Sequence, residues 1–292
     1  MAKYFKLSLK EDDFFKEHMK DLQKGEIYSY DELVSMGEDD FAPKKMLIQK
    51  KLKDYLLPQK NGCVDLSKIQ EDWFPHINDY DIFISHSHAN EKLAIAFSTY
   101  LKEYYGLSCF IDSLIWGNVF ELQKIIDKDY GYSEKDKNGN ILTYSYEKRN
   151  FTTSHVHLML NTALMQSMQA AKLFFFLETP ESINFKNIKD EWTYSPWIYS
   201  ELSMSKSMYE IEKTPKMQNF CECVSRPTKI PLIQKAQTSH LIPITKSKID
   251  DICNKKTGEN ALSSLKNYVS PSSQSYSKTL RVLYENGKKS IR

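Results

Sequence analysis

The chain has 292 residues, 41% of them hydrophobic, which is enough apolar material for one large core or two smaller ones. Forty Lys and Arg residues against 38 Asp and Glu residues leave a net charge of +2, so neither nucleic acid nor an anionic membrane is expected as a partner. The five cysteines include one C-x-C, Cys221 and Cys223, without a second pair at zinc-finger spacing. This low, odd count, the lack of an apolar leader and the lack of an apolar run of membrane-spanning length predict a cytoplasmic protein.

Residues 1–75 are predicted to form a helical N-terminal extension. Ser29 followed by Glu32 has the pattern of a helix cap, and prolines or glycines bound the other helical patterns. The predicted helices cover residues 10–25, 29–37 and 43–58. Three short helices with a basic run between Lys44 and Lys53 could form a DNA-binding bundle, but the many acidic residues of the same segment argue against it.

Strands and helices alternate from residue 80 onward. Four short runs rich in aromatic and β-branched residues have the length of buried strands, and they cover residues 80–85, 107–112, 173–179 and 240–245. An amphipathic helix is predicted from Asn90 to a glycine stop at Gly106, and another begins at Thr153 or Ser154. The alternation predicts a parallel sheet with helices on both faces, whose ligands bind at the carboxyl ends of the strands.

An insert near residues 128–153 separates the second and third predicted strands. A helical pattern in residues 116–130 precedes it, and Asn138-Gly139 is placed like the tip of a hairpin between short polar strands. Toward the end of the chain, a polar loop at residues 270–278 and a final short helix are predicted as part of a C-terminal helical extension.

Small polar residues and histidines follow the first predicted strand directly. Ser85, His86, Ser87 and His88 could hold phosphate or ribose oxygens with help from the N-terminus of the next helix. The H-x-H pair could also bind a metal, but no carboxylate cluster accompanies it, so no metal site is predicted. Loop histidines bonded to the backbone are an equally good interpretation.

Further candidates lie after the second strand and at the start of a later helix. Asp112 could bond a sugar hydroxyl, and Trp116 could stack on a base, although burial against the next helix is a slightly better interpretation. His155 and His157 lie on different faces of a first helical turn. One of them could face a pocket, but capping and surface roles fit each better.

A single glutamate stands out in "TYSPWIYSEL". Ser195 and Pro196 have the positions of a helix cap and first helical residue, and Trp197 and Glu201 then lie one turn apart on the same face. With Tyr194 nearby, the pattern indicates an aromatic pocket around one carboxylate, although a solvated glutamate is the ordinary alternative. A carboxylate over a sugar suits N-glycosidic cleavage, because the transition state carries oxocarbenium character.

Three segments in order resemble the bacterial Toll/interleukin-1 receptor (TIR) domain family: "YDIFISHSHANE", "LSCFIDSLIWGN" and "SPWIYSEL". The last is similar to the W-x-x-x-E-L segment of TIR enzymes that cleave NAD+. The resemblance covers roughly residues 78–250 and implies a flavodoxin-like sheet of about five parallel strands within a domain of residues 76–292. It also implies Glu201 as the catalytic residue, and the predicted substrate-binding residues are Ser85, His86, Ser87, Asp112, Trp116, Tyr194 and Trp197.

The resemblance implies an NAD+ glycohydrolase or ADP-ribosyl cyclase, with NAD+ as substrate and no further cofactor. Thoeris-type antiphage enzymes of this family make ADP-ribose-derived signals, so a homo-oligomer and a separate effector protein activated by the product are expected. The alternative is a TIR scaffold that only self-associates. A receptor adaptor is disfavoured by the missing R-D-x-x-P-G loop, and a phospho-receiver by the lack of paired acids after the first strand. Whether the product is linear, cyclic or transferred stays open.

Overall fold

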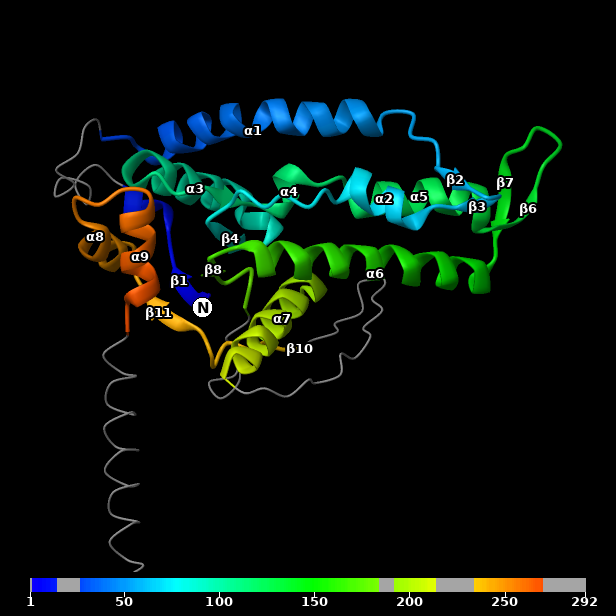
Figure 1. The fold of residues 1–292 in the computed structure, drawn as a ribbon. Helices are drawn as coiled ribbons and strands as arrows, with labels where there is room; N and C mark the ends of the chain where they lie inside the picture. The colour runs from blue at the N-terminus through cyan, green and yellow to red at the C-terminus, as the bar shows by residue number, and fades with distance from the viewer. Residues whose placement is uncertain (1, 15–26, 184–191, 214–233, 270–292) are drawn as a thin grey trace, which may run out of the picture.

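The computed structural model describes residues 2–14, 27–183, 192–213 and 234–269, and its centre is a five-stranded, all-parallel sheet with helices around it (Figure 1). The strand order is β11-β1-β8-β4-β5. The strands are β1 (Lys3–Ser8), β4 (Ile82–Ser85), β5 (Cys109–Phe110), β8 (Leu173–Glu178) and β11 (Ile242–Ile244). This architecture confirms the predicted flavodoxin-like α/β class and all four predicted strands.

Strand β1 is the one strand of the main sheet that sequence analysis did not predict. It pairs with β8 from Lys3↔Leu173 to Ser8↔Glu178, and with β11 on its other side. The expectation of a separate helical extension is therefore wrong at its start, because residues 3–8 belong to the same sheet as the strands predicted from residue 80 onward. The two lysines in "KYFKLS" make the segment look unlike a buried strand. In the structure, however, Lys6 Nζ pairs with Glu178 Oε1 at 3.0 Å, and Phe5 is fully buried.

Nine helices surround the sheet in the described ranges. They are α1 (Tyr30–Leu52), α2 (Leu66–Trp73), α3 (Glu91–Tyr105), α4 (Asp112–Ile115), α5 (Val119–Tyr130), α6 (Tyr146–Ala170), α7 (Pro196–Lys213), α8 (Lys246–Cys253) and α9 (Glu259–Asn267). Two short 3-10 helices are η1 (Glu11–Phe14) and η2 (His88–Asn90). The helix predicted from Asn90 is confirmed as α3, and its chain reverses at Gly106 in the left-handed region.

Three two-stranded antiparallel pairs accompany the main sheet: β2 (Gln59–Lys60) with β3 (Cys63–Val64), β6 (Tyr132–Lys135) with β7 (Ile141–Tyr144), and β9 (Trp192–Thr193) with β10 (Gln234–Lys235). The β6–β7 pair confirms the hairpin predicted around Asn138-Gly139. Helix α6 starts earlier than the predicted Thr153 or Ser154, because Ser145 caps its N-terminus through a bond from the Lys148 amide.

Helix α1 is one continuous helix where two were predicted. It passes through both Gly37 and Pro43, although the sequence pattern predicts a helix boundary at each. Gly37 instead marks a close crossing with α3, since a Cβ atom there would lie 2.4 Å from Ile95 Cγ2 and Thr99 Oγ1. The predicted cap is confirmed, with Ser29 and Glu32 forming a reciprocal capping box.

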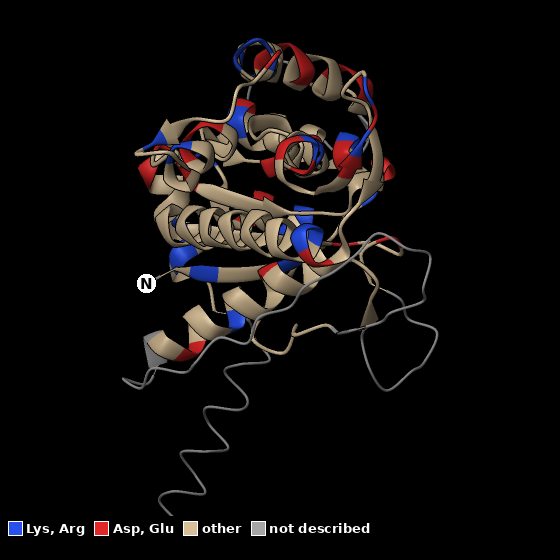
Figure 2. Cartoon of the chain, turned by 90° about the vertical axis from the view of Figure 1, so that its right-hand side faces the viewer, with Lys and Arg blue, Asp and Glu red and all other residues tan. Residues whose placement is uncertain are grey.

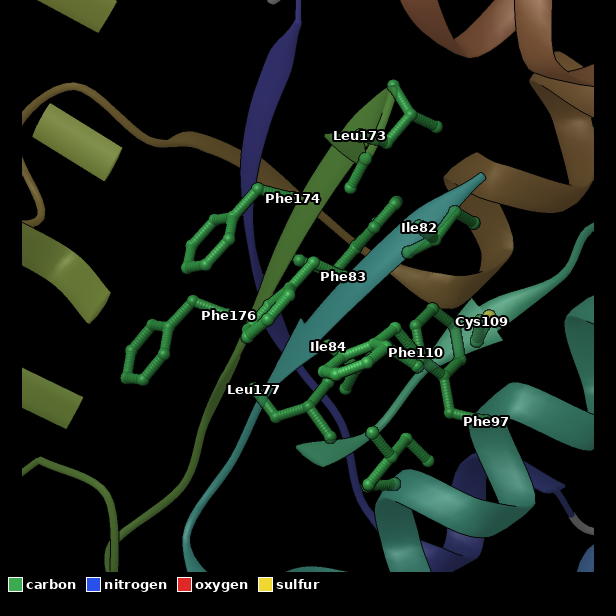
Figure 3. Close-up of a cluster of buried hydrophobic side chains, with 14 of the residues drawn as sticks. Ile82, Phe83, Ile84, Phe97, Cys109, Phe110, Leu173, Phe174, Phe176 and Leu177 are labelled. Carbon is green, nitrogen blue, oxygen red and sulfur yellow. The ribbon is translucent and has the colours of Figure 1, made fainter. Parts of the chain in front are cut away.

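Aromatic side chains fill both faces of the sheet. On one face Phe83 stacks between Phe110 and Phe174, at centroid distances of 5.3 and 5.9 Å. Figure 3 shows Phe174 and Phe176 pointing to the same side of β8. On the other face Phe175 meets Phe97 of α3 edge-on. Because successive strand residues alternate between faces, Ser85 lies on the Phe83 face.

Four helices form an arm beside the sheet. Helices α1 and α6 run outward toward the β6–β7 hairpin, with α2 and α5 between them (Figure 1). Helix α2 packs against both α1 and α6, and α5 packs against α6. In the view of Figure 2, acidic and basic residues are interspersed over the elements.

Within the described ranges, no helix combines the length and the apolar character needed to cross a membrane. The C-x-C of Cys221 and Cys223 and the final helix predicted after residues 270–278 lie outside those ranges.

Candidate active site

The start of α7 is built as predicted. The Ser195 hydroxyl accepts a hydrogen bond from the Ile198 amide at 3.3 Å, and Pro196 takes the first helical position. Ile198 and its neighbour one turn on, Leu202, are buried in the core. Helical spacing then places Trp197 and Glu201 together on an adjoining face.

The side chain of Glu201, which lies on α7, is buried beside the end of the central strand β4. Only 3% of its surface is exposed, and the hydroxyl of Ser85, the last residue of β4, donates a hydrogen bond to Glu201 Oε2. Burial raises the pKa of Glu201, and the nearby Asp112 carboxylate raises it further, while the Ser85 hydrogen bond acts in the opposite direction. The net result is a pKa well above the ordinary value of 4.5.

A cavity of about 700 Å³ lies over Glu201. It is lined at the carboxyl ends of β4 and β5 by His86 and Asp112, the positions expected for a ligand in a parallel sheet. Among the other lining residues, the aromatic ones are Trp73, Phe74, Trp116, Phe120 and Trp197. The structure thus gathers the predicted carboxylate, the loop after the first predicted strand and two predicted tryptophans around one space.

The two tryptophans are held differently. Trp116 is 8% exposed, meets Phe74 and Phe110 edge-on, and donates its indole N–H to the Pro75 carbonyl at 3.2 Å. It is therefore a fixed part of the wall. The predicted burial is confirmed, but these contacts come from residues that precede Trp116 and not from the helix that follows it. Trp197 stacks on His157 with a centroid distance of 5.6 Å and an interplanar angle of 29°.

His86 presents its imidazole ring to the cavity. The residue is 9% exposed, its Nε2 lies 3.5 Å from Ser113 Oγ, and its Nδ1 has no hydrogen-bond partner in the described part of the chain. Burial lowers the pKa of His86 below its ordinary value, which favours the uncharged ring. A buried nitrogen without a partner is costly unless a ligand completes it.

A carboxylate does accompany the two histidines, contrary to the expectation from sequence. Glu91, the first residue of α3, brings a carboxylate oxygen near His86 and His88, and the three potential ligand atoms lie within 4.8 Å of one another. Donors that share one transition metal at about 2.1 Å stand about 3.4 Å apart, so these side chains would have to close around an ion. The positive N-terminal end of α3 also opposes a cation there.

Three predicted substrate-binding residues are not among those lining the cavity. Tyr194 is 57% exposed, Ser87 is half-buried at the start of η2, and Ser85 is fully buried against Glu201. Of the two later histidines, His155 is half-buried and its ring Nδ1 lies 2.8 Å from the Phe151 carbonyl oxygen. His157 faces Trp197 behind the cavity wall, and burial lowers its pKa.

The lining also includes residues that sequence analysis did not connect with the site. Lys45, Gln49 and Lys53 come from α1 and its C-terminal cap, and Trp73 and Phe74 come from the end of α2. The spacing of four residues between the three α1 side chains predicts a shared face. Nothing local indicates that this face covers the ends of strands that follow it in the chain.

Comparisons with protein-family models, with curated proteins and with solved structures find no match for this chain.

Proposed function

We propose that the protein cleaves the nicotinamide–ribose bond of NAD+, as a glycohydrolase or an ADP-ribosyl cyclase. The observation that carries the proposal is the buried carboxylate of Glu201 at the floor of an aromatic cavity, with Asp112 close enough to perturb its ionisation. Two carboxyl groups in one cavity at the carboxyl end of a sheet suit glycosidic chemistry. The TIR-like segments and their order add to this support.

The reaction requires little covalent chemistry from the protein. The bond between the ribose anomeric carbon and the nicotinamide nitrogen breaks, its electron pair goes to the ring, and neutral nicotinamide leaves. The sugar becomes oxocarbenium-like, and an ionised Glu201 stabilises that positive charge. Addition of water gives ADP-ribose and a proton, whereas addition of a ring nitrogen of the same molecule gives a cyclic product.

The raised pKa of Glu201 fits a cationic substrate. Without ligand, burial and Asp112 favour the neutral acid. The positive nicotinamide ring would favour the ionised form once it lies near the carboxylate, since an opposite charge lowers the pKa of an acid. Glu201 would then carry the negative charge that the transition state needs mainly when the substrate is present.

The remaining lining residues have supporting roles in this proposal. The unpartnered Nδ1 of His86 offers a hydrogen bond to a ribose or amide group. Trp197, steadied by His157, provides an apolar wall for an aromatic ring. Ser85 does not line the cavity and acts by positioning Glu201.

The alternative is a non-catalytic TIR scaffold. A scaffold needs a folded surface, and a carboxylate that is 3% exposed beside a second acid works against folding. A buried acid that lowers the stability of the fold is typical of functional sites, where stability is lost in exchange for chemistry. The geometry therefore favours the enzyme.

The experiment is incubation of the purified protein with NAD+ and analysis of the products by chromatography and mass spectrometry. Glu201→Gln keeps the shape of the side chain and removes the charge, so it should lower the rate on the order of a hundredfold or more. Glu210→Gln is the matched control, because Glu210 lies on the same helix, pairs with Lys206 and does not line the cavity.

Equal rates for wild type and Glu201→Gln would contradict the assignment. Absence of turnover by the wild type at every protein concentration, including conditions that promote self-association, would favour the scaffold. A rate per molecule that rises with concentration would support the expected homo-oligomer.

A further inference from the structure

Helix α1 contributes a polar stripe to the cavity. Lys45, Gln49 and Lys53 are four residues apart and all line it, so they follow one face of the helix over about 12 Å. Lys53 is the C-terminal cap of α1, and its amide bonds the Gln49 carbonyl at 2.9 Å. A cationic side chain such as that of Lys53 is favoured here, because the C-terminal end of a helix carries a partial negative charge.

Lys45 and Lys53 carry charges without an opposite charge beside them among the described residues. Neither lysine makes an ion pair in the part of the chain that the structure describes. Their neighbours differ: Lys51 pairs with Asp72 Oδ1 at 2.6 Å, and Lys44 bonds the Tyr80 hydroxyl at 3.2 Å. Among the described lining residues these two lysines are also the only side chains with a permanent positive charge.

We propose that Lys45 and Lys53, with Gln49 between them, form a phosphate-binding subsite that holds the pyrophosphate of the ligand. The proposal rests on the proposed function for the identity of the ligand. Glu201 and Asp112 repel a phosphate, so an anionic ligand needs cations elsewhere in the cavity. Lysines without internal partners can bind phosphate as point charges, and the Gln49 amide adds a donor.

The helix that carries these lysines is anchored on both sides of them. At its first half, Gly37 brings α1 against Ile95 and Thr99 of α3. At its end, Leu52 and Trp73 of α2 both lie so close to Gly117 that a Cβ there would approach each of them to 2.5 Å. The lysines therefore project from a fixed backbone, and phosphate binding pays little ordering cost for the helix.

The arrangement separates two tasks along one ligand. The carboxylates at the sheet act on the ribose that carries nicotinamide, and the lysines of α1 act on the phosphates. It also gives residues 30–53 a role in the site, although they precede the TIR-like segments in the chain. A ligand without phosphate would lose the α1 contacts and keep those to Glu201.

The test is a set of binding measurements by calorimetry in the Glu201→Gln protein, which should bind NAD+ without consuming it. ADP-ribose and NAD+ carry the pyrophosphate, and nicotinamide riboside lacks it. Lys45→Ala with Lys53→Ala should weaken ADP-ribose and NAD+ at least tenfold and change nicotinamide riboside less than twofold. Lys50→Ala is the control, because Lys50 is exposed on the same helix and does not line the cavity.

Lys45→Arg with Lys53→Arg should restore most of the affinity, since the charge returns. In the otherwise wild-type protein the alanine pair should raise KM for NAD+ and leave kcat within about twofold, the pattern of uniform binding. Wild-type affinity of the alanine pair for ADP-ribose would overturn the subsite. Equal weakening of ADP-ribose and nicotinamide riboside would also overturn it, because the lysines would then not act on phosphate.

The subsite and the proposed function can fail separately. If ADP-ribose binding depends on the two lysines but NAD+ is never cleaved, the subsite stands and the enzyme assignment falls. If NAD+ is cleaved at the same KM by the alanine pair, the enzyme stands and the subsite falls. No binding of any of the three ligands to the wild-type or Glu201→Gln protein would overturn the subsite.

Discussion

At the residue scale, the protonation of Glu201 is controlled by three features that act in different directions. Burial and the Asp112 charge raise its pKa, and the Ser85 hydroxyl lowers it. Because the proposed chemistry needs the ionised form, activity should fall as the pH drops through this raised pKa. The acid limb of the rate profile should therefore lie well above pH 4.5, the ordinary value for a glutamate.

Two substitutions should move this acid limb in opposite directions. Asp112→Asn removes a negative charge, so the pKa of Glu201 and the limb of kcat/KM should shift to lower pH. Ser85→Ala removes a hydrogen bond to the ionised form, so the limb should shift to higher pH. The measurement is the midpoint of the limb rather than the absolute rate, since either change can also weaken substrate binding. A limb that stays in place in both variants would show that another group titrates.

Sequence alone could identify the main acid but not its surroundings. The cap at Ser195 and the spacing of Trp197 and Glu201 follow local rules, and they are confirmed by the structure. The contact between Glu201 and Ser85 joins residues 116 positions apart, which no local pattern contains. For the same reason the sequence pattern predicts Tyr194 in the pocket. Its aromatic side chain suits a pocket, but its position in the structure is exposed.

At the element scale, α1 depends on a glycine in its interior. Gly37 allows the helix to pass close to α3, where Ile95 and Thr99 would meet any added Cβ at 2.4 Å. The sequence pattern Ser-x-x-Glu followed by a glycine indicates a short helix with a stop. Tertiary contact decides otherwise, so the glycine serves packing and the helix continues.

Gly37→Ala should therefore destabilise the protein even though alanine is the better helix former. The propensity gain is about 1 kcal/mol, whereas overpacking a tight contact costs about 1 to 3 kcal/mol. Ser35→Ala, on an exposed position two residues earlier, should leave stability unchanged or slightly higher. Urea unfolding followed by circular dichroism measures both. A more stable Gly37→Ala protein would show that the two helices do not cross closely.

At the scale of the whole molecule, the first strand of the chain completes the sheet. Counted from the edge at β5, the strands β5, β4 and β8 take the first three places, and β1 fills the next place before β11. The predicted boundary near residue 75 therefore does not separate an extension from the sheet. The composition changes near residue 75, which suggests a boundary. A local sequence pattern cannot reveal that two strands more than 160 residues apart pair with each other.

Phe5→Ala should test this integration. Phe5 is fully buried and stacks on Phe175 at 5.0 Å, so its truncation should cost about 3 to 5 kcal/mol of unfolding free energy. Ser8→Ala, at the exposed end of the same strand, should cost far less. Thermal and urea unfolding provide the comparison. If Phe5→Ala proved as harmless as Ser8→Ala, β1 would not be a structural part of the sheet.

The place of β1 has a consequence for how the chain is made. Residues 3–8 leave the ribosome long before their partners at 173–178 and 242–244 are synthesised. Throughout that interval the segment has unpaired backbone groups on both edges, and its Phe5 and Leu7 lack their core. Closing such distant pairs is slow, because loop entropy must be overcome before the contacts form. The nascent segment should thus rely on chaperones until residue 244 has emerged, and a bulky group attached just before residue 3 should interfere with completion of the sheet.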